Sequence, residues 1–190
     1  MSSMNRSFRL FLIFCVMLAI MPFTAVAQTQ TAPAQKTEAA PQAKENDVDS
    51  IEHIIAALYD VISGPAGPRD WDRMHSLFYA GARLIPSRRD KSGKVTAFNL
   101  SVDDYIARSR PFFDKEGFVE APVANRIESW DHIAHVWSTY ESRHAKGEKP
   151  FARGINSIQL LHDGNRWWIL TVYWESEEEG HPLPEKYLSK

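Results

Sequence analysis

His75 is the residue of this sequence whose type and position best suit proton transfer. It lies one helical turn after Trp71, in a short segment whose apolar residues recur at helical spacing. An imidazole that is partly withdrawn from water titrates near neutrality, so it can act as a general acid or base. The alternative is a core histidine that is hydrogen-bonded to the backbone. His75 is therefore the best single catalytic candidate.

Two pairs of acidic residues look like catalytic carboxylates but have a structural explanation. Asp70 with Asp72, and Asp103 with Asp104, each open a segment with helical periodicity. Carboxylates at a helix N-terminus accept backbone N–H groups and meet the positive end of the helix dipole. We therefore expect both pairs to cap helices rather than to catalyse a reaction.

The sequence shows no motif for a metal, a nucleotide or a serine nucleophile. His132 and His135 are three residues apart, a separation that on a strand sends two rings to opposite faces, and His132 is expected in the turn before the strand. No zinc pair is therefore expected. No GxSxG elbow and no glycine-rich phosphate loop occurs. The 22 basic and 24 acidic residues are scattered along the chain, which gives no field that attracts nucleic acid. We predict no cofactor, no metal and no nucleic-acid partner.

The amino terminus has the three parts of a secretory signal. Arg6 and Arg9 precede an apolar run over residues 10–21, and residues 25–27 then supply the small-x-small pattern before a cleavage site. The run is shorter than the roughly 20 residues that span a bilayer, although an uncleaved anchor is the alternative. Cleavage after Ala27 predicts an exported protein, periplasmic or secreted, with no membrane attachment and no cysteine.

The rest of the chain divides into a linker and one domain. Residues 28–47 mix Ala and Pro with Gln, Thr and charges and contain no aromatic residue. Such a segment buries too little apolar area to offset its ordering entropy, so we predict a disordered linker. Residues 48–190 form the predicted folded domain.

The periodicity within this domain predicts three helices and a sheet. Apolar residues recur every three or four positions over 51–62, and a run of Gly and Pro follows. Shorter helices are expected from Asp70 and from Ser101, where Asp104 completes a capping box. Strands are expected over residues 82–86, 94–100, 118–130, 133–144, 151–162 and 166–175. This pattern indicates the α+β class, with helices on one face of a mainly antiparallel sheet that curves around a cavity.

The order of these elements resembles the nuclear transport factor 2-like superfamily. The resemblance rests on that order, on LFYAGARLI after the second helix and on DGNRWWILTVYWES near the end. The superfamily includes ketosteroid isomerases, scytalone dehydratase and SnoaL-like polyketide cyclases. It implies a cystatin-like cone, in which three N-terminal helices pack in the concave face of a strongly curved sheet. It also implies a homodimer that forms through the outer sheet face.

Carried over residue by residue, the resemblance argues against isomerase chemistry. That reaction needs a carboxylate base and a second, protonated acid beside a tyrosine. The matching positions hold Pro86, Ser157 and Ile54, none of which can take these roles. We therefore expect a hollow interior that lacks a carboxylic acid.

The resemblance also implies which faces of the last two strands line the cavity, because side chains alternate along a strand. The implied inner residues are Ile155, Ser157, Gln159 and Leu161 on one strand and Trp168, Leu170, Val172 and Trp174 on the next.

For strand 133–144 two orientations stay open, because the length of the following turn decides the register. The favoured inner set is Val136, Ser138, Tyr140 and Ser142, and the other is His135, Trp137, Thr139, Glu141 and Arg143. Arg153 could contact an anionic group of a ligand, or it could form an ion pair on the outer face.

Three functions follow, in order of preference. The first is an exported domain that binds a small apolar or cyclic organic ligand, without isomerase activity. The second is a SnoaL-like enzyme for acid–base chemistry, with His75 as base and Tyr140 as donor. The third is a dimeric interaction module. The predicted pocket residues are Tyr140, Ser138, Ser157, Gln159, Leu170 and Trp174.

Overall fold

The computed structural model describes residues 40–188. The helices are α1 (Ile51–Ile62), α2 (Trp71–Leu77) and α3 (Val102–Phe113), with 3-10 turns η1 (Glu45–Asp47) and η2 (Glu185–Tyr187). The strands are β1 (Phe78–Arg89), β2 (Val95–Ala97), β3 (Val119–Trp130), β4 (Ile133–Arg143), β5 (Ala152–His162) and β6 (Trp167–Ser176). The predicted signal peptide, and the predicted linker as far as residue 39, lie outside the described residues. Within 40–188 no helix is long and apolar enough to cross a membrane.

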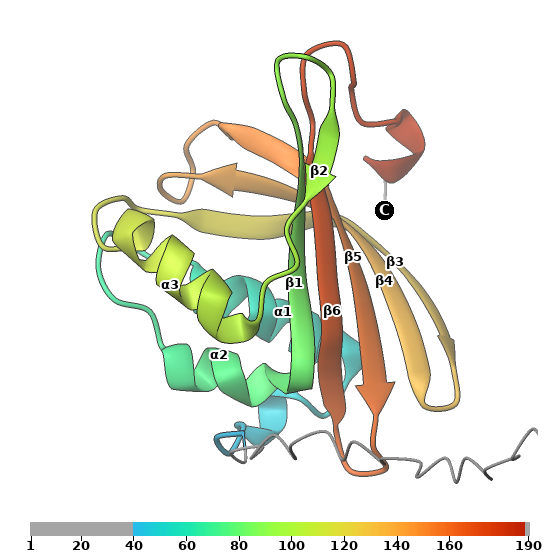
Figure 1. Ribbon diagram of the computed structural model, residues 1–190. Helices are drawn as coiled ribbons and strands as arrows, with labels where there is room; N and C mark the ends of the chain where they lie inside the picture. The colour runs from blue at the N-terminus through green and yellow to red at the C-terminus, as the bar shows by residue number, and fades with distance from the viewer. Residues whose placement is uncertain (1–39, 189–190) are drawn as a thin grey trace, which may run out of the picture. The chain divides into compact units, whose positions relative to one another are not determined.

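The six strands form one sheet in the order β2-β1-β6-β5-β4-β3. The pair β1–β6 is parallel and the other pairs are antiparallel. All three helices lie on one face of this sheet, whereas η2 lies on the other (Figure 1). The predicted α+β class and the helices on one face of a mainly antiparallel sheet are therefore confirmed.

Apolar side chains from the helices and from the inner sheet face form one core. Ile54 and Ile55 of α1 and Met74 of α2 are almost completely buried, because the apolar stripe of each helix faces the strands. The predicted caps are present: Asp70 accepts the backbone N–H of Arg73, and Ser101 with Asp104 forms a capping box. These acids therefore begin helices, as expected from their positions.

The last residues of the predicted linker pack on the domain. Asp47 in η1 is buried and accepts two hydrogen bonds from the guanidinium of Arg73, at 2.7 and 3.0 Å. Arg73 also pairs with Asp60 of α1 at 2.5 Å. This cluster joins η1 to α1 and α2.

A bulge in β6 determines which residues face the helices. Leu160 pairs with Ile169 and the next β5 position, Gln159, pairs with Thr171, so Leu170 is the extra residue. A one-residue insertion inverts the alternation beyond it. Trp174 consequently lies on the same face of the sheet as its cross-strand partner Asn156. The prediction that Ser157 and Trp174 share the inner face is therefore wrong.

The chain beyond β6 folds back over the outer sheet face. We call residues 177–188 the C-terminal strap. Glu177 accepts two hydrogen bonds from Arg153, at 2.8 and 3.0 Å. At the other end, the hydroxyl of Thr139 donates to the carbonyl of Tyr187 at 2.6 Å, and the Tyr187 ring packs against Trp137. The strap therefore occupies part of the face predicted to form the dimer.

We predict that Asp47→Asn lowers the free energy of unfolding by about 2 kcal/mol at pH 7, because hydrogen bonds between charged groups contribute about that much. The Arg73 guanidinium holds the pKa of the Asp47 carboxyl below 3.8. The pair therefore contributes stability above that pH, and the contribution is lost as pH falls through the folded-state pKa. The difference between the two proteins should close below about pH 4, as measured by urea unfolding at several pH values.

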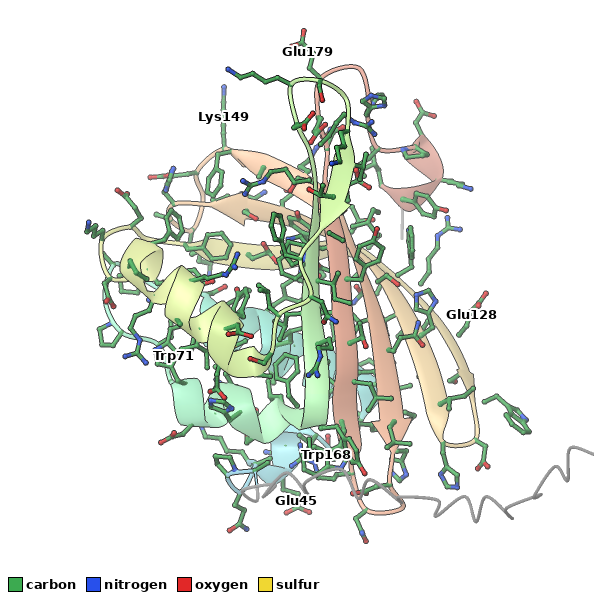
Figure 2. The ribbon with its side chains drawn as sticks, in the orientation of Figure 1. Glu45, Trp71, Glu128, Lys149, Trp168 and Glu179 are labelled. Atoms are coloured by element: carbon green, nitrogen blue, oxygen red, sulfur yellow. The ribbon has the colours of Figure 1, made fainter. Side chains whose placement is uncertain are left out.

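Glu128→Gln is the matched control, because it also removes one negative charge. Glu128 lies on β3, on the opposite side of the sheet from Trp71 of α2 (Figure 2). It is exposed and forms no ion pair with any residue in 40–188. Equal losses for both variants would show that the Asp47 pair does not anchor η1.

Candidate functional site

A cavity of about 130 Å³ lies between the helices and the inner face of the sheet. Its wall is mainly apolar and contains a few polar side chains. The lining residues are Leu58, Tyr59, Ile62, Met74, Leu84, Tyr105, Phe118, Glu120, Tyr140, Asn156, Val172 and Trp174. A mainly apolar hollow with a small number of polar groups is the usual form of a small-molecule site.

Glu120 is the only carboxylate among these lining residues. It lies on β3 directly opposite Ser142 of β4, whose hydroxyl donates to one carboxylate oxygen at 2.7 Å. Withdrawal from water raises the pKa of Glu120 to about 7, although the side chains of Ser142 and Asn156 favour its charged form. The carboxyl therefore changes protonation state near neutral pH.

The expectation of an interior without a carboxylic acid is therefore wrong. That expectation followed from the two positions carried over from the isomerases, Pro86 and Ser157, and neither position is on β3. The sequence does contain a signal, because Glu120 is the lone charged residue in the otherwise apolar run from Phe118 to Val123. An acid in such a run at the start of a predicted strand is a candidate for burial.

A chain of hydrogen bonds runs from the cavity lining into the wall behind it. Ser138 donates to the side-chain oxygen of Asn125 at 2.6 Å, so its own oxygen must accept the hydroxyl of Tyr59 at 2.6 Å. The Tyr59 oxygen in turn accepts the amide of Asn156 at 3.0 Å. Burial raises the pKa of Tyr59 well above its ordinary value, so its proton stays in this chain.

Tyr140 and Trp174, two of the predicted pocket residues, lie in the lining. The Tyr140 hydroxyl is 3.0 Å from the hydroxyl of Ser176, and burial raises the pKa of Tyr140 to about 12. A side chain at Gly154, the cross-strand partner of Tyr140, would collide with that hydroxyl. The favoured orientation of β4 is confirmed, since Val136, Ser138, Tyr140 and Ser142 are all buried.

The other predicted pocket residues lie elsewhere. Ser138 is buried behind Tyr59 rather than in the lining. Ser157 is on the outer face, 3.0 Å from the His135 ring, and Gln159 is exposed on that face. Leu170 is the bulge residue. The bulge explains the errors on β5 and β6, because it pairs Trp174 with Asn156, so Asn156 rather than Ser157 shares the face of Trp174.

The charged candidates also lie outside the cavity. The His75 ring is at the surface, with Nε2 3.1 Å from a carboxylate oxygen of Asp103 in the first turn of α3. Arg153 is on the outer face and is engaged by Glu177 of the strap. Neither residue lines the cavity. The group that can exchange protons with a bound molecule is therefore Glu120 rather than His75.

The residues from 40 to 188 contain no group of three or more side chains arranged to hold a metal ion. The arrangement in the cavity instead suits acid–base exchange and hydrogen bonding. Glu120 can donate when protonated and accept when charged. The mainly apolar side chains around it lower the local polarity, which strengthens either interaction.

Comparison with known proteins shows similarity at the level of structure. No protein-family model matches the chain, and no curated protein sequence matches it. A protein of unknown function with a cystatin-like fold from Nostoc punctiforme aligns over 67% of this chain and 88% of its own, with 10% identity and a TM-score of 0.52.

Two further solved structures give similar values. An NTF2-like protein of unknown function from Pseudomonas putida covers 66% of this chain and 82% of its own, with 10% identity and a TM-score of 0.51. A structure described as a putative calcium/calmodulin-dependent protein kinase type II association domain, from Thiobacillus denitrificans, covers 68% and 97%, with 10% identity and a TM-score of 0.50. At these identities the likeness concerns the fold alone, and residues 40–188 have the NTF2-like, cystatin-like α+β fold.

Proposed function

We propose that the protein binds a small, single-ring organic molecule in the inner cavity, with Glu120 as the group that hydrogen-bonds to it. The observation that carries this proposal is a mainly apolar cavity of about 130 Å³ with one carboxylate in its wall. An engineered apolar cavity of roughly 150 Å³ holds benzene, whereas sites for drug-sized ligands have roughly 300–1,000 Å³. The volume therefore favours one ring and argues against a steroid.

The chemistry of the wall limits the ligand further. Glu120 with a pKa of about 7 is partly protonated at neutral pH, so it pairs with a carbonyl, a hydroxyl or an amine. A carboxylate on the ligand would be repelled by the charged form of Glu120. We therefore propose a neutral or weakly basic ring that carries one polar group.

Acid–base catalysis is the second candidate function, and the same residue favours it. A general base works best when its pKa is near the working pH, and Glu120 meets this condition. In this proposal the charged Glu120 carboxylate removes a proton from the carbon next to a ring carbonyl, and the protonated carboxyl then returns a proton to the carbon of the resulting enolate. Tyr140 would donate a hydrogen bond to the carbonyl oxygen.

Location and assembly form part of the proposal. We propose that binding takes place outside the cytoplasm, a location supported by the signal that the sequence predicts over residues 1–27. We also propose a homodimer that uses the part of the outer sheet face left free by the strap. Neither feature is needed for the cavity to bind its ligand, because every lining residue belongs to one chain.

The partly buried carboxyl of Glu120 should make stability depend on pH. The pKa of Glu120 rises from an ordinary 4.5 to about 7 on folding, so the folded protein binds the proton more tightly. Stability is therefore greatest below pH 4.5 and falls as pH rises to 7, by about 3 kcal/mol from this group. Glu120→Gln should lack this decline, as measured by urea unfolding between pH 4.5 and 8. Glu128→Gln should keep the wild-type decline, and a Glu120→Gln profile that parallels wild type would place Glu120 in water.

Filling the cavity should abolish ligand binding. We expect benzene, phenol and cyclohexanone to raise the melting temperature, by about 3 °C at ten times Kd. Val172→Phe puts a ring into the cavity and should remove this shift, whereas Thr171→Phe adds the same ring on the other face of β6 and should keep it. Equal shifts in both variants would show that the probes bind elsewhere.

The catalytic candidate has its own test. In D2O the protein should increase the rate at which deuterium replaces hydrogen at the carbons next to the carbonyl of cyclohexanone. This rate is measured by NMR. Glu120→Gln should reduce the enzyme-dependent rate by at least about 100-fold, a typical contribution of general base catalysis. His75→Ala should leave it unchanged. If cyclohexanone binds but its deuterium exchange is no faster than without protein, the binding function remains supported and catalysis of proton transfer on cyclohexanone is excluded.

A further inference from the structure

The far edge of strand β3 is open along its second half. In the strand order, β2 and β3 are the two outermost strands, and β2 has only three residues. The start of β3 is covered by the loop after α1, where Gly64 pairs with Phe118 and the Ser63 hydroxyl bonds to the backbone of Glu120. Among residues 40–188, no strand pairs with residues 125–130 except β4 on the other side. Their outward N–H and C=O groups can therefore pair with a further strand.

This open segment lacks the backbone features that protect an edge strand. Pro122, which has no N–H group, and a bulge before Ala124 interrupt the first half of β3. Residues 125–130 contain neither feature, and all six are exposed. Ile127 is 38% exposed and Trp130 is 77% exposed. Exposed apolar side chains on a free edge are typical of a strand that pairs with another chain.

The charges of this segment indicate which chain binds there. Arg126 and Glu128 lie on the outer face of the sheet, like their cross-strand partners Trp137 and His135. On neighbouring strands, opposite charges that face each other stabilise pairing and like charges destabilise it. Charges of one sign would keep identical copies apart, but here the two signs alternate on one face. The segment can therefore match a second copy of itself.

Antiparallel pairing of two β3 edges allows few registers. Only alternate residues present their N–H and C=O groups to the free edge, so either an even or an odd residue number must face its own copy at the two-fold axis. Each central residue fixes which charges face each other.

Only one central register pairs opposite charges. With Arg126 at the axis it meets the partner's Arg126, and with Glu128 there it meets the partner's Glu128. With Ile127 at the axis, Arg126 faces the partner's Glu128, and the symmetry forms this pair twice. In that register Asn125 faces the partner's Ser129, and these side chains can share a hydrogen bond. We infer that two copies of this chain associate through antiparallel pairing of their β3 edges, with Ile127 at the two-fold axis.

The C-terminal strap orients the arginine of this contact. The Arg126 guanidinium donates to the carbonyl of Lys186 and lies 5.2 Å from the centre of the Tyr187 ring. A guanidinium has five N–H donors, so others remain for the partner's Glu128. The strap thus holds Arg126 on the outer face, where the partner's carboxylate arrives.

Edge pairing differs from the homodimer proposed above. That homodimer packs two outer faces against each other, whereas edge pairing joins two sheets side by side. Because only one short segment of each copy pairs, we expect weak association that is lost on dilution. The unfolding comparisons that use Glu128→Gln are therefore made on the dilute monomer.

The first test places one thiol at the proposed axis. Cys15 is the only cysteine of the sequence, so a Cys15→Ser chain is the background. Ile127→Cys then brings two Cα atoms to about 4.5–5.5 Å, which a disulfide can span. We expect mild oxidation to give a covalent dimer on non-reducing electrophoresis. Ile133→Cys is the matched control, because Ile133 is 59% exposed but lies on β4, two strands away from its copy, and it should stay monomeric.

Charge reversal tests the register. Arg126→Glu and Glu128→Arg should each weaken association about tenfold, because each puts two like-charged pairs at the contact. The double variant Arg126→Glu/Glu128→Arg should associate like wild type, since the pairs are restored with their signs exchanged. Sedimentation equilibrium measures the dissociation constants.

Other outcomes would overturn the inference. Absence of the Ile127→Cys crosslink, or equal crosslinking at Ile133→Cys, would exclude this axis. A double reversal that associates no better than the single variants would exclude the register. Association without a crosslink at Ile127→Cys would support the outer-face homodimer instead, because that packing leaves the two Ile127 side chains on far sides of the pair. A monomer at every concentration would exclude both contacts.

Discussion

A chain of four hydrogen-bonded side chains connects helix α1 to three strands. Asn156 of β5 donates to Tyr59 of α1, Tyr59 donates to Ser138 of β4, and Ser138 donates to Asn125 of β3. Tyr59, Ser138 and Asn156 are buried, so loss of any link would leave a polar group without water or partner, at a cost of about 1–3 kcal/mol. The chain runs in one direction and is fully satisfied, which holds α1 in register against the sheet.

This register gives the inner cavity its shape. With α1 held by Tyr59, the space between Leu58, Val172 and Trp174 stays partly open, and Glu120 borders it from β3. A carboxyl in such surroundings would be costly if it were always charged. The raised pKa lets it take up a proton instead, and the hydroxyl of Ser142 supports the charged form when it is present. A group that is stable in both states is the requirement for proton exchange.

The two faces of the sheet have different chemistry, although the same strands form both. The inner face is apolar with one carboxylate, and the outer face beneath the strap contains several acids. Alternation along β4, β5 and β6 separates these sets, because neighbouring residues such as Asn156 and Ser157 point in opposite directions. The strap also changes the surface available for association, since it covers part of the outer face.

Local patterns in the sequence determined the elements of this protein. Helical spacing over 51–62, the caps at Asp70 and Ser101, and the strand runs after residue 118 predicted the α+β fold, because these signals act within a few residues. The tertiary structure alone decided the site. One extra residue at Leu170 inverts the alternation of β6, which removes Ser157 and Gln159 from the lining and puts Asn156 there. Glu120 acquires its raised pKa from side chains on α1, α3 and other strands, and His75 is left at the surface because α2 turns it toward Asp103. Burial and register depend on contacts between distant segments, and so residue types alone could not reveal them.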